Sequence, residues 1–184
     1  MNSDSFLDNL DPALRIRLKQ IGKPVLKRRG ELIYASGDEG RTVWLVEEGR
    51  VRLYVLTVEG RKLVTAFVGA GGLIGEAALY GGPQHTTFAE AAADTRLLAV
   101  PAAEFRCLML DCPALSLRVT QGLAERIRHA ESSAESLLRQ SASARMAALL
   151  LRLTRGEAGE VRGLAHQDLG DMIGVYRETA TVIL

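Results

Sequence analysis

The sequence lacks the features that would set it apart from ordinary globular proteins. Its formal net charge is only +1, so any contact with nucleic acid must come from a local patch of charge. No apolar run approaches the roughly 20 residues of a membrane-spanning helix, and residues 1–10 do not resemble a signal peptide. The composition therefore predicts a cytoplasmic protein of one large or two small domains.

Cysteines and catalytic constellations are equally scarce. Cys107 and Cys112 are too few for a disulfide framework or a structural zinc site. Their spacing leaves a redox-sensing pair open, but such cysteines are more often small hydrophobic packing residues. We find no paired catalytic carboxylates, no metal-ligand spacing and no nucleophile with a partner histidine. The sequence thus predicts neither an enzyme nor a metal site.

An amphipathic helix followed by many short strands is predicted for the amino-terminal part. Apolar residues within the range 6–21 recur at steps of three and four, which is typical of a helix with one buried face. The segment 42–68 has the pattern of three strands with hairpin turns at Gly49 and Gly60. A further pair of strands is expected around residues 93–94. Short strands at this spacing predict a small antiparallel β-roll or jelly roll.

A long helix with a narrow apolar seam is predicted from residue 113 to about residue 139. Its apolar residues alternate steps of four and three, as in a coiled coil, and charged residues flank them. Alanines in the seam allow close approach, so the pattern favours a parallel dimer interface. A helix that packs only on its own domain is the alternative. The expected interface residues are Leu123, Ile127, Ala130, Ala134 and Leu137.

The carboxy-terminal segment has the pattern of two short helices joined by a tight turn. Residues 166–173 form the first helix, and Gly174 supplies the positive-φ residue that ends it. A second helix is expected to begin at Val175. Such a pair is a helix-turn-helix, whose second helix enters the major groove of DNA. Ordinary packing of two helices is the alternative.

Three polar residues lie near the start of that second helix, where side chains reach base edges. Arg177 suits a guanine, Glu178 suits the amino group of a cytosine, and Thr179 suits a phosphate. The block GVYRETATVIL resembles the recognition helix of the cyclic AMP receptor and fumarate–nitrate reduction regulator family, bacterial transcription factors that carry Arg-Glu-Thr at this point. Further DNA contacts are expected from His166, Gln167 and Tyr176.

The resemblance covers nearly the whole chain. It implies a homodimeric regulator that binds double-stranded DNA at a two-fold symmetric site and contacts RNA polymerase. The implied fold class is α+β, with an antiparallel roll similar to a cyclic-nucleotide-binding domain, a dimerisation helix and a winged helix-turn-helix. Because the sequence ends inside the recognition helix, before the family's wing, we expect a fragment. The expected domains are residues 1–110 for the roll with its amino-terminal helix, 111–140 for the central helix and 141–184 for the DNA-binding domain.

Only part of the family's cyclic-nucleotide pocket is present in the sequence. Gly75 and Glu76 match the family's Gly-Glu, whose glutamate holds the ribose, but Thr86 stands where the family has a phosphate-binding arginine. On the central helix, Ala130 and Glu131 replace the Thr-Ser pair that contacts adenine. A threonine supplies no charge for a buried phosphate, so cyclic AMP is not the expected effector. The candidate pocket residues are Gly75, Glu76, Ala77, His85, Thr86, Thr87 and Glu131.

Two interpretations of this pocket stay open. In the first, His85 replaces the missing arginine and the pocket binds a cyclic nucleotide. In the second, which we favour, the segment is a retained fold element in which Glu76 forms an ion pair or satisfies backbone donors and His85 is a solvated loop residue. The second resembles family members that activate stress genes without a small-molecule effector. A ligand-sensing module that signals through a protein contact is a further alternative.

One position within the recognition helix departs from the family. Val182 lies where many members carry a further base-reading arginine. Its apolar side chain cannot form hydrogen bonds with a guanine edge. The preferred DNA sequence is therefore expected to differ at the matching base pair.

Overall fold

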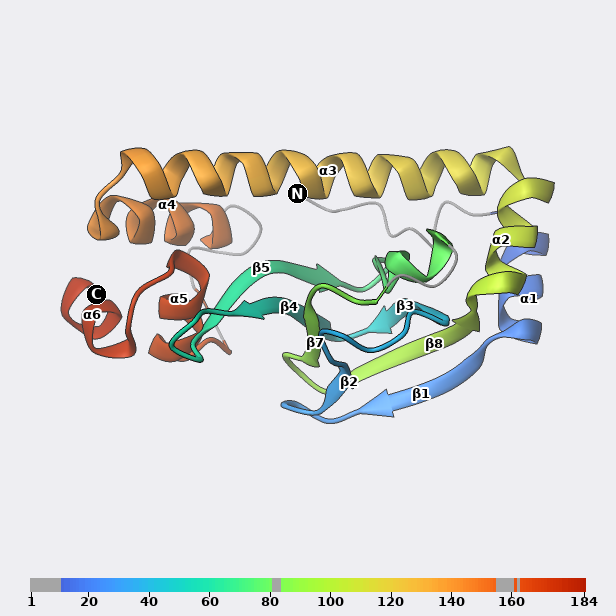
Figure 1. Cartoon of the computed structure of the whole chain (residues 1–184), viewed down its shortest axis with the longest axis horizontal. Helices are drawn as coiled ribbons and strands as arrows, with labels where there is room; N and C mark the ends of the chain where they lie inside the picture. Colours follow the sequence, from blue (N-terminus) through green and yellow to red (C-terminus); the bar gives the residue numbers. More distant parts are fainter. Residues whose placement is uncertain (1–10, 81–83, 155–160, 162) are drawn as a thin grey trace.

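The computed structural model describes residues 11–80, 84–154, 161 and 163–184. Its strands form a β-roll, the long helix α3 runs alongside that roll, and helices α4, α5 and α6 lie at one end (Figure 1). The helices are α1 (Pro12–Ile21), α2 (Ala102–Asp111), α3 (Pro113–Arg139), α4 (Ala142–Thr154), α5 (His166–Ile173) and α6 (Arg177–Ile183), with a 3-10 helix, η1 (Glu76–Tyr80). The strands are β1 (Lys23–Lys27), β2 (Leu32–Tyr34), β3 (Thr42–Glu48), β4 (Arg50–Leu56), β5 (Lys62–Gly69), β6 (Leu73–Ile74), β7 (Phe88–Ala91) and β8 (Thr95–Pro101).

The roll consists of two four-stranded antiparallel sheets with the strand orders β1-β8-β3-β6 and β2-β7-β4-β5. Apolar side chains of both sheets meet between them, where Val46, Val51 and Leu97 are fully buried. Of the two predicted hairpins, the one at Gly60 is present, since β4 pairs with β5. The hairpin predicted at Gly49 is wrong, because β3 pairs with β6 and β8 while β4 pairs with β5 and β7, so the chain changes sheets there. Both turn glycines have positive φ. The predicted antiparallel roll is therefore confirmed.

The strands on either side of residues 93–94 exist but do not pair with each other, contrary to prediction. Strand β7 pairs with β2 and β4, whereas β8 pairs with β1 and β3. The bend between them carries the chain from one sheet to the other. Thr95 fixes this crossing, because its buried hydroxyl donates to the carbonyl of Ala93 (2.7 Å) and accepts from the amide of Arg50 (3.2 Å).

A second apolar cluster joins helices α1, α2 and the start of α3 to one sheet of the roll. Leu18, Phe105 and Leu115 are completely buried in it. Helix α1 begins at Pro12 because the carboxylate of Asp11 accepts a hydrogen bond from the amide of Ala13 at 2.8 Å. The earlier part of the predicted helix, from residue 6, lies outside the described residues.

Helix α3 begins and ends at the predicted residues. Most of the apolar seam predicted along it is exposed to solvent. Ile127 is 59% exposed, and Ala130 and Ala134 are also exposed. Leu123 instead packs against the edge of the apolar cluster on the roll. The side chain of Leu137 lies outside the described residues. Apart from Leu123, the described part of the seam is thus accessible, although Ala130 and Ala134 also line a cavity between α3, β5 and α4.

Helices α4, α5 and α6 share a third apolar cluster, and we call them together the helix-turn-helix unit. Its buried members include Met146, Leu169 and Ala180. The sequence Ser141-Ala-Ser interrupts the apolar pattern and resembles the family's hinge, but α4 begins at Ala142, so only Ser141 of these three residues lies in the break between α3 and α4. The wing of the expected winged helix-turn-helix stays untested. Within the described residues, no helix has the length and apolarity to cross a membrane.

Candidate DNA-binding site and effector pocket

The turn between α5 and α6 has the geometry of a helix-turn-helix. Gly174 ends α5 with φ 73° and ψ 36°, the left-handed conformation that the sequence predicted. Helix α6 begins at Arg177, two residues later than expected, and Tyr176 is its extended N-cap residue. Tyr176 therefore precedes the recognition helix instead of belonging to it.

Two small residues bring α5 and α6 into close contact. Ala180 of α6 is completely buried, and a Cβ atom added to Gly170 of α5 would lie 3.0 Å from the carbonyl oxygen of Val175 and 3.5 Å from the Cβ of Ala180. A larger side chain at either position would push the helices apart. This contact fixes which face of α6 is buried and turns the opposite face outward.

The predicted base-contacting residues lie on that outward face. Arg177, Glu178 and Thr179 are all exposed, so their polar groups are accessible to a groove without rearrangement of the core. Val182 is 86% exposed on the same short helix. The structure thus leaves the Arg-Glu-Thr block accessible, while its contacts with bases remain predictions.

The predicted phosphate-contacting residues of α5 already have partners within the unit. The Nδ1 atom of His166 lies 3.0 Å from Oγ1 of Thr181, whose hydroxyl donates to the carbonyl of Arg177 (2.9 Å). Because that hydroxyl has a single proton, Nδ1 of His166 must be the donor. In the neutral imidazole Nε2 is then an acceptor, so a hydrogen bond from Nε2 to a phosphate requires the doubly protonated ring. The side-chain amide of Gln167 donates to Asp171 at 2.6 Å, and burial raises the pKa of the Asp171 carboxyl.

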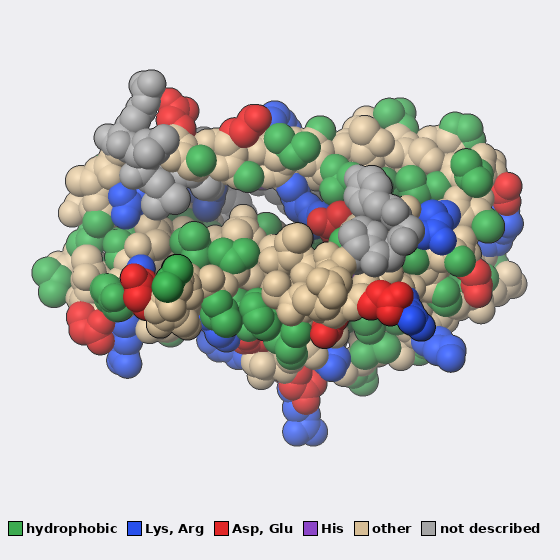
Figure 2. Space-filling model, viewed as in Figure 1, with side chains coloured by type: hydrophobic (Ala, Val, Ile, Leu, Met, Phe, Trp, Pro, Cys, Tyr) green, Lys and Arg blue, Asp and Glu red, His purple; other side chains and the backbone are tan. Residues whose placement is uncertain are grey.

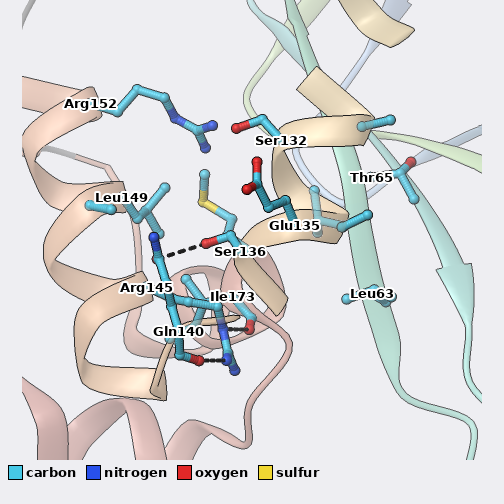
Figure 3. A pocket seen from close by; sticks show the side chains of 15 residues that line it. Leu63, Thr65, Ser132, Glu135, Ser136, Gln140, Arg145, Leu149, Arg152 and Ile173 are labelled. Carbon is cyan, nitrogen blue, oxygen red and sulfur yellow. Dashed lines mark hydrogen bonds between the residues drawn. The ribbon is translucent and has the colours of Figure 1, made fainter. Parts of the chain in front are cut away.

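Arg145 connects the helix-turn-helix unit to the end of the central helix. Its Nε donates to the carbonyl of Ile173 (3.1 Å) and its Nη1 donates to the carbonyl of Gln140 (2.8 Å), as Figure 3 shows. The two bonds join the end of α5 to the residue after α3. A cavity of about 550 Å³ lies beside them between β5, α3, α4 and α5, and Figure 2 shows an opening between α3 and the roll.

The first part of the candidate effector pocket adopts a conformation that requires glycine. Gly75 is buried with φ 78°, and a Cβ atom there would lie only 2.7 Å from the carbonyl oxygen of Thr42. The chain then enters the 3-10 helix η1 at Glu76, followed by half-buried Ala77. The predicted Gly-Glu corner is thus present as a structural element.

The carboxylate of Glu76 is occupied by a residue of the central helix. The guanidinium of Arg126 forms an ion pair with Oε1 of Glu76, and its Nη1 donates to the carbonyl of Leu73 at 3.2 Å. Both side chains are largely shielded, at 23% and 29% exposure. The other carboxylate oxygen, Oε2, is buried and has no hydrogen-bond partner among the described residues. Glu76 therefore forms the ion pair that the second interpretation expected.

His85 is buried, so the expectation of a solvated loop residue is wrong. It is 6% exposed, and its ring stacks on that of Tyr34 with centroids 3.8 Å apart. Burial lowers the pKa of His85 despite the nearby carboxylates of Glu76 and Asp38. Burial also raises the pKa of the Tyr34 hydroxyl to about 12, and the charge of Glu76 adds to that effect. The aromatic pair is neutral at pH 7.

The remaining predicted pocket residues supply no positive charge. Thr86 is exposed, and Thr87 is half-buried with its side chain hydrogen-bonded to Tyr34. Glu131 is exposed on α3. Within the described part of the chain, the cation beside Glu76 is Arg126, which sequence reasoning counted only as a flanking charge. Arg126 lies one helical turn before Ala130, a position that the family resemblance places at the pocket, and this spacing could have identified it from the sequence.

Comparisons with known proteins agree with this arrangement. Residues 25–112 match the family model of the cyclic nucleotide-binding domain. The chain is 31% identical to the cyclic AMP receptor protein of Thermus thermophilus over 156 residues, which cover 85% of this chain and 72% of that protein. It is 34% identical to the transcriptional regulator SdrP of the same organism, over 91% of this chain and 83% of that protein. The structure of CLP, a c-di-GMP responsive global regulator of Xanthomonas campestris, has a TM-score of 0.85 at 19% identity and 95% coverage of this chain and 90% of that one.

The roll, the central helix and the helix-turn-helix unit define a protein with the architecture of a transcription regulator. The relatives are regulators of transcription and not enzymes. The chain belongs to the family of the cyclic AMP receptor and the fumarate–nitrate reduction regulator.

Proposed function

We propose that this chain is a sequence-specific DNA-binding regulator that acts as a homodimer on a two-fold symmetric site, without cyclic AMP as its effector. The observation that carries the proposal is the outward face of α6, where Arg177, Glu178 and Thr179 are exposed while Ala180 anchors the helix from behind. Arginine and glutamate at the start of such a helix suit guanine and cytosine edges. The face is chemically matched to a major groove.

The exposed seam of α3 supports the dimeric part of the proposal. A 59% exposed isoleucine, Ile127, lies on it with the exposed alanines Ala130 and Ala134. Burying this stripe against a second copy removes apolar surface from water, and regulators of this family act as dimers. A two-fold dimer places two recognition helices on successive major-groove turns of a palindrome.

The pocket supports independence from cyclic AMP. Arg126 already pairs with Glu76, the carboxylate that would hold a ribose hydroxyl. Burial lowers the pKa of His85 and so disfavours its charged form, and the side chain of Thr86 has no charge. A cyclic phosphate would enter without a positive partner at the expected position, which costs free energy.

The proposal extends to the setting in which the protein acts. RNA polymerase is a second partner, because the relatives are regulators of transcription. The protein acts in the cytoplasm, where bacterial DNA is accessible, and a role in stress responses would suit a regulator that needs no small-molecule signal. These statements rest on the family and on the pocket together.

The test is equilibrium binding to DNA sites selected from a random library, measured by fluorescence anisotropy at several salt concentrations. We expect selection of a two-fold symmetric site, and a linear fall of log affinity with log salt that reports phosphate contacts. Addition of cyclic AMP should change the affinity by less than twofold. Binding that requires the nucleotide would favour the cyclic-nucleotide-responsive alternative, and absence of any DNA affinity would favour the module with a protein-contact output.

A further inference from the structure

The helix-turn-helix unit is attached to the roll by charged side chains that the DNA-binding proposal does not use. Lys62, Glu90, Arg52, Asp168 and Arg29 form a chain of alternating charges, which we call the interdomain cluster. Its first three members belong to strands of the roll, and Asp168 belongs to α5. Figure 1 shows the β4–β5 hairpin reaching α5 at this end of the roll.

The central link of the cluster is the pair between Arg52 and Asp168. The Nη1 atom of Arg52 donates to Oδ1 of Asp168 at 2.9 Å, and the side chains are only 17% and 12% exposed. The same guanidinium pairs with Glu90, whose side chain is 5% exposed. Lys62 Nζ donates to Glu90 at 2.6 Å. Arg29 lies more loosely, with Nη2 3.4 Å from Oδ2 of Asp168.

Asp168 also determines the start of α5. Its Oδ2 accepts a hydrogen bond from the amide of Ala165 at 2.9 Å, which satisfies one of the amides at the start of the helix. One carboxylate therefore fixes the beginning of α5 and binds it to the roll. A change at Asp168 affects both the helix and its orientation.

A second contact holds the start of the recognition helix. The guanidinium of Arg61, at the end of the β4–β5 turn, lies over the ring of Tyr176 with 4.1 Å to the ring centroid. Tyr176 directly precedes Arg177, the first predicted base-contacting residue. The hairpin thus contacts α5 and the N-cap residue of α6, while Arg177, Glu178 and Thr179 remain exposed.

Charges in this position are suited to fixing orientation. An apolar contact tolerates sliding, whereas a shielded ion pair requires one geometry and is penalised when its partners separate. We propose that Arg52 and Asp168, together with Arg61 and Tyr176, are positioning residues that hold the recognition helix at the angle needed for DNA without any ligand. This inference rests on the proposed function, and it adds what replaces an effector in orienting the helix.

The decisive measurement is the dependence of DNA affinity on half-site spacing. A rigidly held pair of recognition helices should discriminate among spacers that differ by one or two base pairs, because each base pair rotates and shifts the second half-site. We expect the unchanged protein to prefer one spacing at least tenfold. Asp168→Asn and Arg61→Ala should each reduce that preference to within about threefold, and because the preference is a ratio of affinities, a uniform loss of half-site affinity leaves it unchanged.

Matched controls separate orientation from folding. Asp11→Asn alters a carboxylate that caps α1 and is remote from the interface, and Arg41→Ala removes an exposed guanidinium paired only locally with Glu39. Both should keep the spacing preference of the unchanged protein. Thermal unfolding followed by circular dichroism identifies any variant that is unfolded at the assay temperature, and the assay is then repeated below its transition.

Hydrogen exchange without DNA distinguishes failure of this inference from failure of the proposed function. In Asp168→Asn, amides of α5 and of the β4–β5 hairpin should exchange at least fivefold faster, whether or not the protein binds DNA. An unchanged spacing preference in a variant that binds DNA would overturn the inference, and so would unchanged exchange. A more than tenfold gain in DNA affinity would also overturn it, since it would make the contact inhibitory.

Discussion

Similar side chains are paired with one another in the candidate effector pocket and are exposed to solvent on the outward face of α6. In the pocket, the carboxylate of Glu76 pairs with Arg126 of the same chain, and the rings of Tyr34 and His85 stack on each other. On α6, Arg177 and Glu178 are exposed side by side. A group that is already paired inside the chain has less to gain from an external ligand, because binding must first break the internal contact. This contrast supports the proposal that α6 recognises DNA and that the pocket residues stabilise the fold.

The largest expected effect comes from a substitution that prevents dimer formation and so separates the two recognition helices. Ile127→Asp places a charge in the exposed seam of α3, where burial of an unpaired carboxylate opposes dimer formation. We expect a monomer in sedimentation velocity experiments and a fall of about a hundredfold or more in affinity for a two-fold site, since the second half-site no longer contributes. Leu110→Asp, at an 84% exposed position on α2, is the control. A dimeric Ile127→Asp protein would contradict the assignment of the interface.

The next effect tests whether the exposed face of α6 recognises bases. Arg177→Ala should cost about 1–3 kcal/mol for each half-site, concentrated at one base pair. Selected sites carrying each of the four base pairs at every position, titrated against both proteins, measure this. Arg41→Ala is the control for loss of an exposed arginine. An equal loss of affinity on every sequence would assign Arg177 to a phosphate.

A smaller effect, on the stability of the fold at high pH, is expected from the ionisation of Tyr34 in the candidate pocket. The folded-state pKa of Tyr34 is raised to about 12, above an unfolded value of about 10. The unfolded state therefore releases its proton first, and stability that is fully present below pH 10 is lost as the pH rises toward 12. The loss is on the order of 2 kcal/mol. Urea unfolding at pH 9 and pH 11.5 measures this loss. Tyr34→Phe should remove this part of the pH dependence. An equal fall in the free energy of unfolding between the two pH values in both proteins would contradict the prediction.

The smallest effect is expected from opening the ion pair in the pocket. Arg126→Ala leaves Glu76 without its partner at a site of 29% exposure, so the free energy of unfolding should fall by about 1 kcal/mol. Arg128→Ala, on the same helix, removes a 73% exposed side chain 3.9 Å from Glu125 and should change stability less. Urea titrations at pH 7 compare the two. Equal losses would show that the Glu76 pair contributes nothing specific.

Local sequence patterns predicted most elements of the fold. The hairpin turn at Gly60, the alternation of four and three along α3, and Gly174 each act within a few residues, and the structure confirms them. At Gly49 the same kind of pattern gave a turn between two sheets instead of a hairpin. The pairing of the strands around residues 93–94 was mispredicted, because adjacency in sequence does not reveal that the chain changes sheets. Thr95 signals that crossing only through contacts with Arg50 and Ala93.

The candidate sites were predicted less completely, because residues that meet in the fold can be far apart in the sequence. The Arg-Glu-Thr block was visible because its three residues are consecutive. Arg52 and Asp168 are 116 positions apart, so no local pattern relates them. His85 has the neighbours of a loop residue, and only the fold reveals the aromatic ring of Tyr34 beside it.

The length of α3 determines how far a small tilt at one of its ends displaces the other end. Its 27 residues span about 40 Å at 1.5 Å per residue. A tilt of about 5° at one end therefore displaces the other by about 3.5 Å, close to the 3.4 Å spacing between successive bases on one strand of DNA. A small change in how the first turn of α3, which contains Leu115, packs in the cluster with Phe105 of α2 therefore displaces the far end of α3 by about one base pair. The stiffness of α3 thus limits which substitutions these two core residues tolerate.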